Sequence, residues 1–82
     1  MPSPVAAVVE VAARALVDSP DKVTVTETPH RGTTLVELTV AQADTGKVIG
    51  RQGRIAEALR TLVAATAHQH GIRATLEIRD PE

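Results

Sequence analysis

The feature that most constrains the fold of this 82-residue chain is a pair of glycines, Gly50 and Gly53, between two segments of helical periodicity. A glycine inside a helix costs roughly 1 kcal/mol relative to alanine, so two of them three residues apart predict a break. Glycine also lets the backbone turn sharply and approach a partner closely. The stretch VIGRQGRIAEALR, residues 48–60, therefore predicts a helix, a tight turn over residues 50–53 and a second helix.

The helix after the break is predicted over residues 54–70, the clearest helical pattern in the chain. Its expected core stripe consists of Ile55, Leu59, Leu62, Val63 and Thr66. The helix before the break is short, over residues 41–49, with Asp44 in its first turn.

A further helix is predicted near the start, over residues 4–18. Ser3 is a favourable N-cap, and Pro4 suits the first helical position, where no backbone N–H is needed. Pro20 marks the end of this helix.

Strict alternation of apolar and polar residues predicts three half-buried strands, over residues 22–27, 33–41 and 72–79. The first two are separated by a turn over residues 28–32, so we expect them to pair as antiparallel neighbours. The side chains expected to face the core are those of Val23, Val25, Val36, Leu38, Val40, Ile72, Ala74, Leu76 and Ile78. Residues 80–82 form a short tail.

The predicted order of elements is α-β-β-α-α-β. Three strands with one apolar face need a cover, and three amphipathic helices supply it, so we expect one α+β domain over residues 1–82. The chain contains no Phe, Trp or Tyr, so its core must be built from Val, Leu, Ile and Ala.

Positive charge is concentrated around the glycines. Residues 47–60 carry Lys47, Arg51, Arg54 and Arg60 against Glu57, a sum of +3, although the whole chain has a net charge of −1. A focused basic patch can hold phosphate even on a weakly acidic protein. The start of the second helix adds unpaired N–H groups and the positive end of its dipole, which also bind phosphate.

These features predict a narrow cleft for one nucleic-acid strand. We expect the phosphates to be held by Lys47, Arg51, Gln52 and Arg54 together with the backbone of residues 50–53. We expect the bases to lie on Val48, Ile49, Ile55, Leu38 and Val40. The plainer interpretation is that Gly50 ends one helix and Gly53 makes a tight turn, with no ligand involved.

Several classes of function are disfavoured. Cysteine is absent, which excludes disulfides and thiolate chemistry. The first residues lack the pattern of a secretory leader, so we expect none, and no apolar run reaches the roughly 18 residues that a membrane span needs. We therefore expect a cytoplasmic protein. No His-Ser or His-Asp constellation suggests catalysis, and we expect no enzyme activity, no metal and no cofactor.

Nearly the whole chain resembles the KhpA family of small bacterial RNA-binding proteins with one KH domain. The resemblance lies in ALVDSPDKVTV, in LTVAQADTGKVIGRQGRIAEALRTLV and in LEIRD. GKVIGRQGR is similar to the KH signature, in which an isoleucine precedes a G-x-x-G loop. One departure is AQAD, residues 41–44, in place of the family's proline- and glutamate-containing lead-in.

The resemblance implies a type II KH fold, with a three-stranded sheet covered on one face by three helices. It implies that the loop at residues 50–53 clamps about four nucleotides of single-stranded RNA by their backbone. It also implies pairing with a second copy or with a larger KH-domain partner of the KhpB type (also called EloR or Jag), and a role in RNA regulation, cell elongation and cell-wall homeostasis.

The alanines of the helix at residues 54–70 allow two interpretations: they are simply good helix formers, or they form a smooth second face for a dimer. They are Ala56, Ala58, Ala64, Ala65 and Ala67. The alternative function, from another class, is a protein-interaction module in which RNA contact is incidental.

Overall fold

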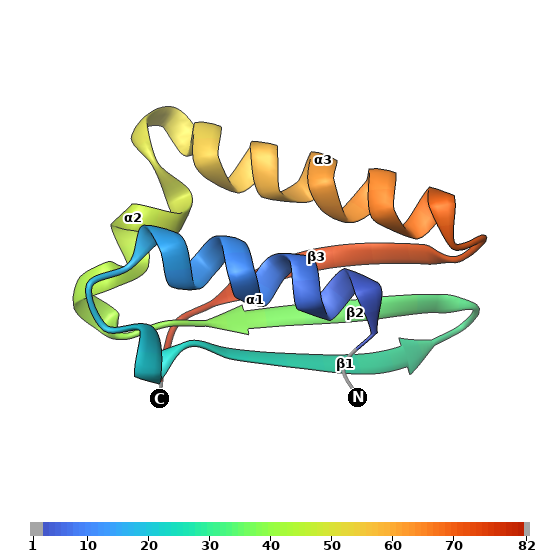
Figure 1. Cartoon of the computed structure of the whole chain (residues 1–82), viewed down its shortest axis with the longest axis horizontal. Helices are drawn as coiled ribbons and strands as arrows, with labels where there is room; N and C mark the ends of the chain where they lie inside the picture. Colours follow the sequence, from blue (N-terminus) through green and yellow to red (C-terminus); the bar gives the residue numbers. More distant parts are fainter. Residues whose placement is uncertain (1–2, 82) are drawn as a thin grey trace.

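A computed structural model describes residues 3–81 (Figure 1). The elements, in chain order, are α1 (Pro4–Leu16), the 3-10 helix η1 (Pro20–Lys22), β1 (Thr24–His30), β2 (Thr33–Thr39), the 3-10 helix η2 (Gln42–Asp44), α2 (Thr45–Ile49), the 3-10 helix η3 (Arg51–Gly53), α3 (Arg54–Gln69) and β3 (Arg73–Arg79). The expected α-β-β-α-α-β order and the α+β class are confirmed. Glu82, expected in the tail, lies outside the described residues.

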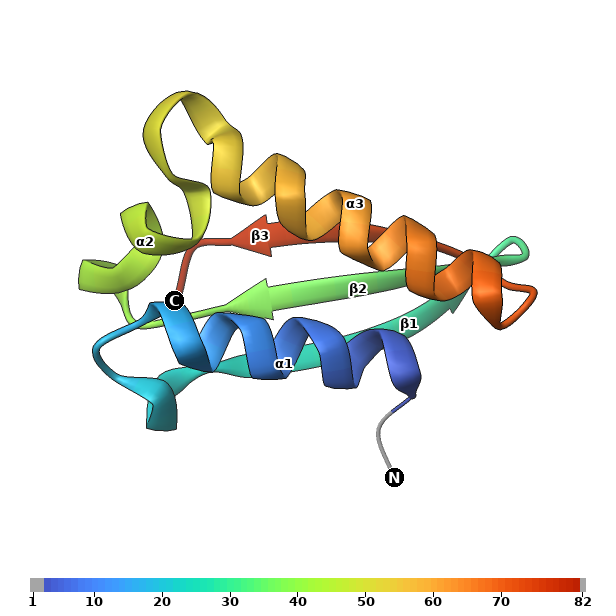
Figure 2. The same cartoon turned by 45° about the horizontal axis from the view of Figure 1, so that its top comes forward.

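The three strands form one mixed sheet in the order β1-β2-β3. β1 and β2 are antiparallel, as expected, with Val25 opposite Leu38. β2 and β3 are parallel, with Val36 opposite Leu76, because the chain crosses over through α2 and α3 between them. α1 and α3 lie side by side on the same face of the sheet, and α2 packs against both helices at one end (Figures 1 and 2).

The first hairpin differs from its prediction. β1 continues to His30, where a turn had been expected from residue 28, so only Arg31 and Gly32 connect the strands. Pro29 is accommodated because β1 is an edge strand, where a missing N–H is tolerated. The two turn residues both have positive φ, at 50° and 80°, which a two-residue hairpin connection of this kind requires.

The core lies between the sheet and the helices and is entirely aliphatic. It is formed by Val5, Val9, Ala13, Val23, Val36, Leu38, Val40, Val48, Leu59, Val63, Ala67 and Leu76. At α1, Ser3 caps the first turn as expected, since its hydroxyl oxygen accepts the N–H of Ala6 at 3.2 Å. The helix ends at Leu16, two residues earlier than expected.

The predicted core stripe of α3 is partly wrong. Leu62 is 46% exposed, and Ile55 and Thr66 are only half-buried. The fully buried face consists of Ala56, Leu59, Val63 and Ala67. Since α3 packs closely over the sheet beside α1, small alanines occupy the positions of closest approach. The same burial removes Ala56 and Ala67 from the smooth dimer face predicted from sequence.

The last strand begins one residue later than expected, at Arg73. Leu76 is buried, and Ala74 and Ile78 are half-buried against the core, so the predicted inward face of β3 is correct. Ile72 precedes the strand and is 41% exposed, so its predicted inward position is wrong.

Candidate functional site

The predicted break is a sharp kink between α2 and α3. Gly50 has φ 78° and ψ 173°, Gln52 has φ 58° and ψ 25°, and Gly53 has φ 72° and ψ 16°. Such values are rare for residues with a Cβ atom, so the two glycines relieve steric strain in a turn where Gln52 already adopts the left-handed conformation. The kink places η3 as an exposed corner directly before the first turn of α3 (Figure 2).

The backbone amides of the kink are not all available to a ligand. The N–H of Gly50 donates to the carbonyl of Gly46 at 2.9 Å, and the N–H of Gly53 donates to the carbonyl of Gly50 at 3.1 Å. Both glycine amides are therefore satisfied within the chain. The N–H groups of Arg51 and Gln52 lie in the first turn of η3 and have no partner inside that short helix. They are the donors that remain for a ligand.

The side chains of Arg51, Gln52 and Arg54 are exposed around this corner. Arg54 Nη2 donates to Oε1 of Gln52 at 3.3 Å, which orients the amide over the turn. Within residues 3–81, neither Arg51 nor Arg54 forms an ion pair, so both guanidinium groups keep their charge for an external anion.

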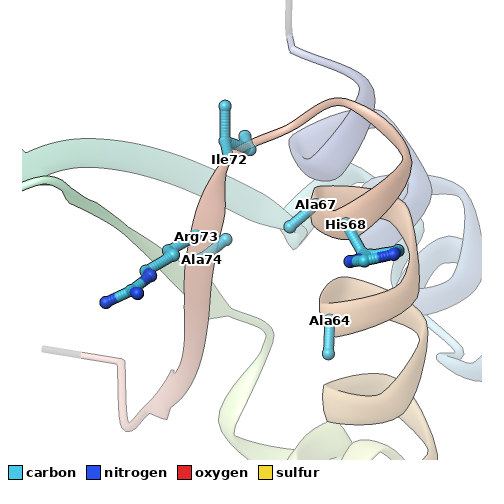
Figure 3. Close-up of a pocket in the computed structure, with 6 residues that line it drawn as sticks. All are labelled: Ala64, Ala67, His68, Ile72, Arg73 and Ala74. Atoms are coloured by element: carbon cyan, nitrogen blue, oxygen red, sulfur yellow. The ribbon is translucent and has the colours of Figure 1, made fainter.

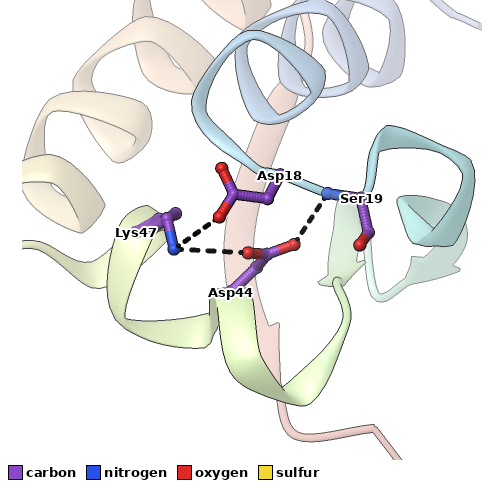
Figure 4. A network of polar contacts seen from close by, with 4 residues as sticks. All are labelled: Asp18, Ser19, Asp44 and Lys47. Carbon is purple, nitrogen blue, oxygen red and sulfur yellow. Dashed lines mark hydrogen bonds and ion pairs between the residues drawn. The ribbon is translucent and has the colours of Figure 1, made fainter.

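Lys47 is different, because two carboxylates hold its ammonium group (Figure 4). Its Nζ lies 3.2 Å from Oδ2 of Asp18 and 3.5 Å from Oδ1 of Asp44. The hydrogen bond and charge of Asp18, followed by those of Asp44, raise the pKa of Lys47 above its ordinary value in spite of some desolvation. The expected role of Lys47 as a free phosphate ligand is therefore not what its contacts favour.

Asp44 is the one buried charged residue in the described part of the chain, with 2% exposure. Its Oδ2 accepts the backbone N–H of Ser19 at 3.0 Å. Burial acts to raise the pKa of Asp44, but hydrogen bonds from the backbone of Ser19 and Asp18 and the interaction with Lys47 together outweigh burial and lower it. Asp44 is thus a carboxylate at neutral pH.

The predicted apolar floor is largely wrong. Leu38 and Val48 are 0% exposed and Val40 is 2% exposed, so these three side chains belong to the core and offer a base no surface. Leu38 lies on β2, the central strand of the sheet. Val40 directly follows β2, and Val48 lies on α2, which packs against α1 and α3, so all three side chains join the same core cluster. Ile49 and Ile55 are half-buried beside the kink and are the apolar side chains that remain there.

A second groove, missed from the sequence, lies between the C-terminal half of α3 and the start of β3 (Figure 3). It has a volume of about 260 Å³ and is lined by Ala64, Ala67, His68, Ile72, Arg73 and Ala74. Ala67 and Ala74 point toward each other across it. The sequence feature that could have indicated this groove is the short connection of residues 70–72, which requires β3 to turn back beside α3.

The comparisons with known proteins bear on this arrangement. The sequence model of the family described as KhpA/KhpB, KH domain, matches residues 6–78. The chain belongs to this KH-domain family. A KH domain is a non-enzymatic RNA-binding fold, so the family confirms that the chain is no enzyme.

Curated relatives match this KH domain along most of their length. The RNA-binding protein KhpA of Treponema pallidum is 57% identical over 68 residues, which cover 83% of this chain and 85% of the relative. The RNA-binding protein KhpA of Aquifex aeolicus is 52% identical over 71 residues, which cover 87% and 90% of the two chains.

Among solved structures, Era in complex with MgGDPNP and nucleotides 1506–1542 of 16S ribosomal RNA is similar in fold. The TM-score is 0.68 at 17% identity, and the match covers 98% of this chain and 31% of the Era chain. At that identity the likeness speaks for the fold alone. Together with the family match, it confirms the expected type II KH fold.

Two further properties concern residues 3–81 only. None of the helices there combines the length and the apolar character that crossing a bilayer requires. In the same range, no three His, Cys, Asp or Glu side chains come together in a way that could hold a metal ion.

Proposed function

We propose that this KH domain binds single-stranded RNA through the kink at residues 50–53. The observation that carries the proposal is the exposed kink at the N-terminus of the 16-residue helix α3, where two arginines have no carboxylate partner among residues 3–81. Helix N-termini favour phosphate because their N–H groups and the helix dipole face it. The relatives' name, RNA-binding protein KhpA, supports the same ligand.

The strand would pass from the kink along α3. Arg51, Gln52 and Arg54 hold phosphates, while Ile49 and Ile55 offer apolar contact to the first bases. Arg60 is exposed and lies four residues before Ala64, so it shares the face of α3 that borders the second groove. This places a positive charge between the kink and the groove, and the groove beside β3 takes the following base.

The test compares two pairs of substitutions that change the net charge equally. Arg51→Asp with Gln52→Asp should abolish most of the affinity for a short single-stranded RNA, measured by fluorescence anisotropy at two salt concentrations. Arg14→Asp with Gln69→Asp makes the same change in charge on α1 and at the end of α3, and should retain binding. Circular dichroism checks the fold of both variants. Equal binding by the two variants would contradict the proposal.

We also propose that the domain pairs with a second KH domain, either its own copy or a KhpB-like protein. The family description, KhpA/KhpB, supports such a partner. So does the exposed apolar surface that α1 and α3 share, where Val11 is 70% and Leu62 is 46% exposed. A groove of about 430 Å³ between the two helices is lined by Ala12, Ala15, Leu16, Arg54, Ile55, Ala58, Leu59 and Leu62. Two joined domains would bind RNA more tightly through effective concentration.

Light scattering tests the pairing. The wild type should have the mass of a dimer alone or with the partner, and Leu62→Glu should have the mass of a monomer; a monomeric wild type with no complex contradicts pairing. The same measurement separates the alternative, a protein-interaction module. If Arg51→Asp with Gln52→Asp loses RNA but keeps its partner, RNA binding depends on residues 51 and 52 and pairing does not, although Arg54 and Ile55 border both surfaces.

The cellular role that we propose is RNA regulation in the cytoplasm, linked to cell elongation and cell-wall homeostasis. Membership of the family and the proposed pairing support this role. A deletion strain complemented with the wild type should recover normal cell length. Complementation with Arg51→Asp plus Gln52→Asp should not, and full recovery with that variant would separate the role from RNA binding.

A further inference from the structure

We propose that Lys47 is a positioning residue, which holds the kink in place as the internal counter-ion of Asp44 and Asp18, and that it does not bind RNA phosphate itself. This inference rests on the proposed RNA binding. It concerns a lysine only three residues before Gly50, within the basic segment of the chain.

The first step is that both carboxylate oxygens of Asp44 already have partners. Both oxygens of this buried carboxylate are used, Oδ2 by the N–H of Ser19 at 3.0 Å and Oδ1 by Nζ of Lys47 at 3.5 Å. Removing one partner of a buried charge is strongly destabilising, because the other charge is left uncompensated. Lys47 is therefore held where it is by the side chain beneath it.

The second step concerns local charge. Lys47 contributes +1, while Asp44 and Asp18 contribute −2 at distances of 3.5 and 3.2 Å from its Nζ, so the cluster as a whole is negative. A phosphate approaching Lys47 would meet net repulsion. Arg51 and Arg54 have no carboxylate partner within residues 3–81 and attract phosphate without that opposition.

The third step connects the cluster to the kink. Asp44 ties the linker between α1 and η1, at Ser19, to the start of α2 (Figure 4). α2 is only five residues long, and the N–H of Gly50 bonds back to its Gly46 at 2.9 Å. Because so short a helix has little stability of its own, its position depends on such tertiary contacts, and movement of α2 would displace the kink.

The experiment is a double-mutant cycle with Lys47→Met, Asp44→Asn and both together. Lys47→Met alone leaves the buried carboxylate of Asp44 without its counter-ion. We expect the Tm of this variant to fall by on the order of 5–10 °C and its RNA affinity to drop several-fold. In the double variant, the amide oxygen that replaces the carboxylate still accepts the N–H of Ser19, and no buried charge remains. Asp18, with a side chain 79% exposed, is solvated by water. We therefore expect Tm and RNA affinity to return close to wild type.

The dependence of RNA affinity on salt provides the readout that a phosphate ligand would change. Losing one phosphate contact to a single strand makes the slope of log K against log salt shallower by about 0.7. The double variant should keep the wild-type slope, whereas Arg51→Met should lower it, with or without Asp44→Asn. A double variant that regains its Tm but not its affinity, with a reduced slope, makes Lys47 a phosphate ligand and overturns the inference.

The failure of the two proposals can be told apart. If the wild type binds no RNA but the cycle shows coupling in Tm between Lys47 and Asp44, the proposed function has failed while the structural role of Lys47 stands. If the effects of the two substitutions on Tm simply add, or the double variant fails to fold, the inference is overturned whether or not RNA binds.

Discussion

A Cβ atom added to Gly50 would lie 2.6 Å from Cγ1 of Ile55. The kink therefore folds back onto the first apolar side chain of α3, which fills the space that a side chain at residue 50 would need. The same glycine has φ 78°, a value that residues with a Cβ atom rarely adopt. Space and backbone conformation both require glycine at this position.

Gly50→Ala should consequently lower the free energy of unfolding by about 2 kcal/mol or more, because strain and overpacking add. Urea denaturation followed by circular dichroism measures this. Gly46→Ala is the matched control, since Gly46 lies inside α2 and a Cβ there meets no atom within 4 Å. That variant should be neutral or stabilised by up to roughly 1 kcal/mol through helix propensity. Equal losses in both variants would contradict the tight packing of the kink.

Arg51→Gln should weaken binding of short single-stranded RNA several-fold and reduce the salt slope by about 0.7, the value for one phosphate contact. Arg14→Gln is the control, because Arg14 lies on α1 with Nη2 3.1 Å from Oε1 of Glu10. It should leave both quantities unchanged. Titrations at four salt concentrations provide the slopes. Equal slopes for wild type and Arg51→Gln would show that Arg51 makes no phosphate contact.

Filling the groove between α3 and β3 tests whether it takes a base. Ala64→Phe places an aromatic ring in the groove and should reduce RNA affinity several-fold while leaving the fold intact. Ala65→Phe adds the same ring at the next residue, which is exposed and does not line the groove. Anisotropy titrations compare the two variants, and the groove has no part in binding if their affinities are the same.

The burial of Leu38 makes a prediction about stability. Leu38 is 0% exposed, so Leu38→Ala should cost about 2–5 kcal/mol by the transfer and cavity effects of a core truncation. Leu62→Ala, at a position 46% exposed, should change unfolding of the monomer by no more than about 0.5 kcal/mol. Urea denaturation at protein concentrations low enough for a monomer measures both, and a small effect of Leu38→Ala would contradict its place in the core.

The charged state of Asp44 predicts a dependence of stability on pH. Its pKa in the folded protein lies below the ordinary value of 3.8, so the unfolded chain binds the proton more readily. The stabilisation from Asp44 is therefore present above about pH 4 and is lost as the pH falls from there through the folded pKa. Thermal unfolding between about pH 2.5 and 6 should show a steeper loss at the acid end for wild type than for Asp44→Asn; identical curves would contradict the prediction.

Lys47 affects the pH dependence of stability at the alkaline end of the pH range. Its pKa is raised above 10.5, so its contribution is fully present below that value and is lost as the pH rises through the folded pKa. Between about pH 5 and 9 neither group should change the unfolding free energy.

The sequence alone was sufficient for the order of the elements, the strand periodicity and the place of the kink. These properties are local: alternation sets which side of a strand is apolar, and Gly50 and Gly53 mark the residues where a helix cannot continue. The inward positions of Val36 and Leu38 on β2, and of Val40 directly after it, were predicted correctly for the same reason.

Only the tertiary structure decided which of these residues can meet a ligand. Leu38, Val40 and Val48 have the apolar character of a cleft floor, but all three are buried in the core between the sheet and the helices. Lys47 has the charge of a phosphate ligand, but it pairs with Asp18, which lies far from it in the sequence, and with Asp44, whose burial the sequence pattern does not show. Exposure and ion pairing depend on contacts between segments far apart in the chain, and the periodicity of one segment carries no information about its partners.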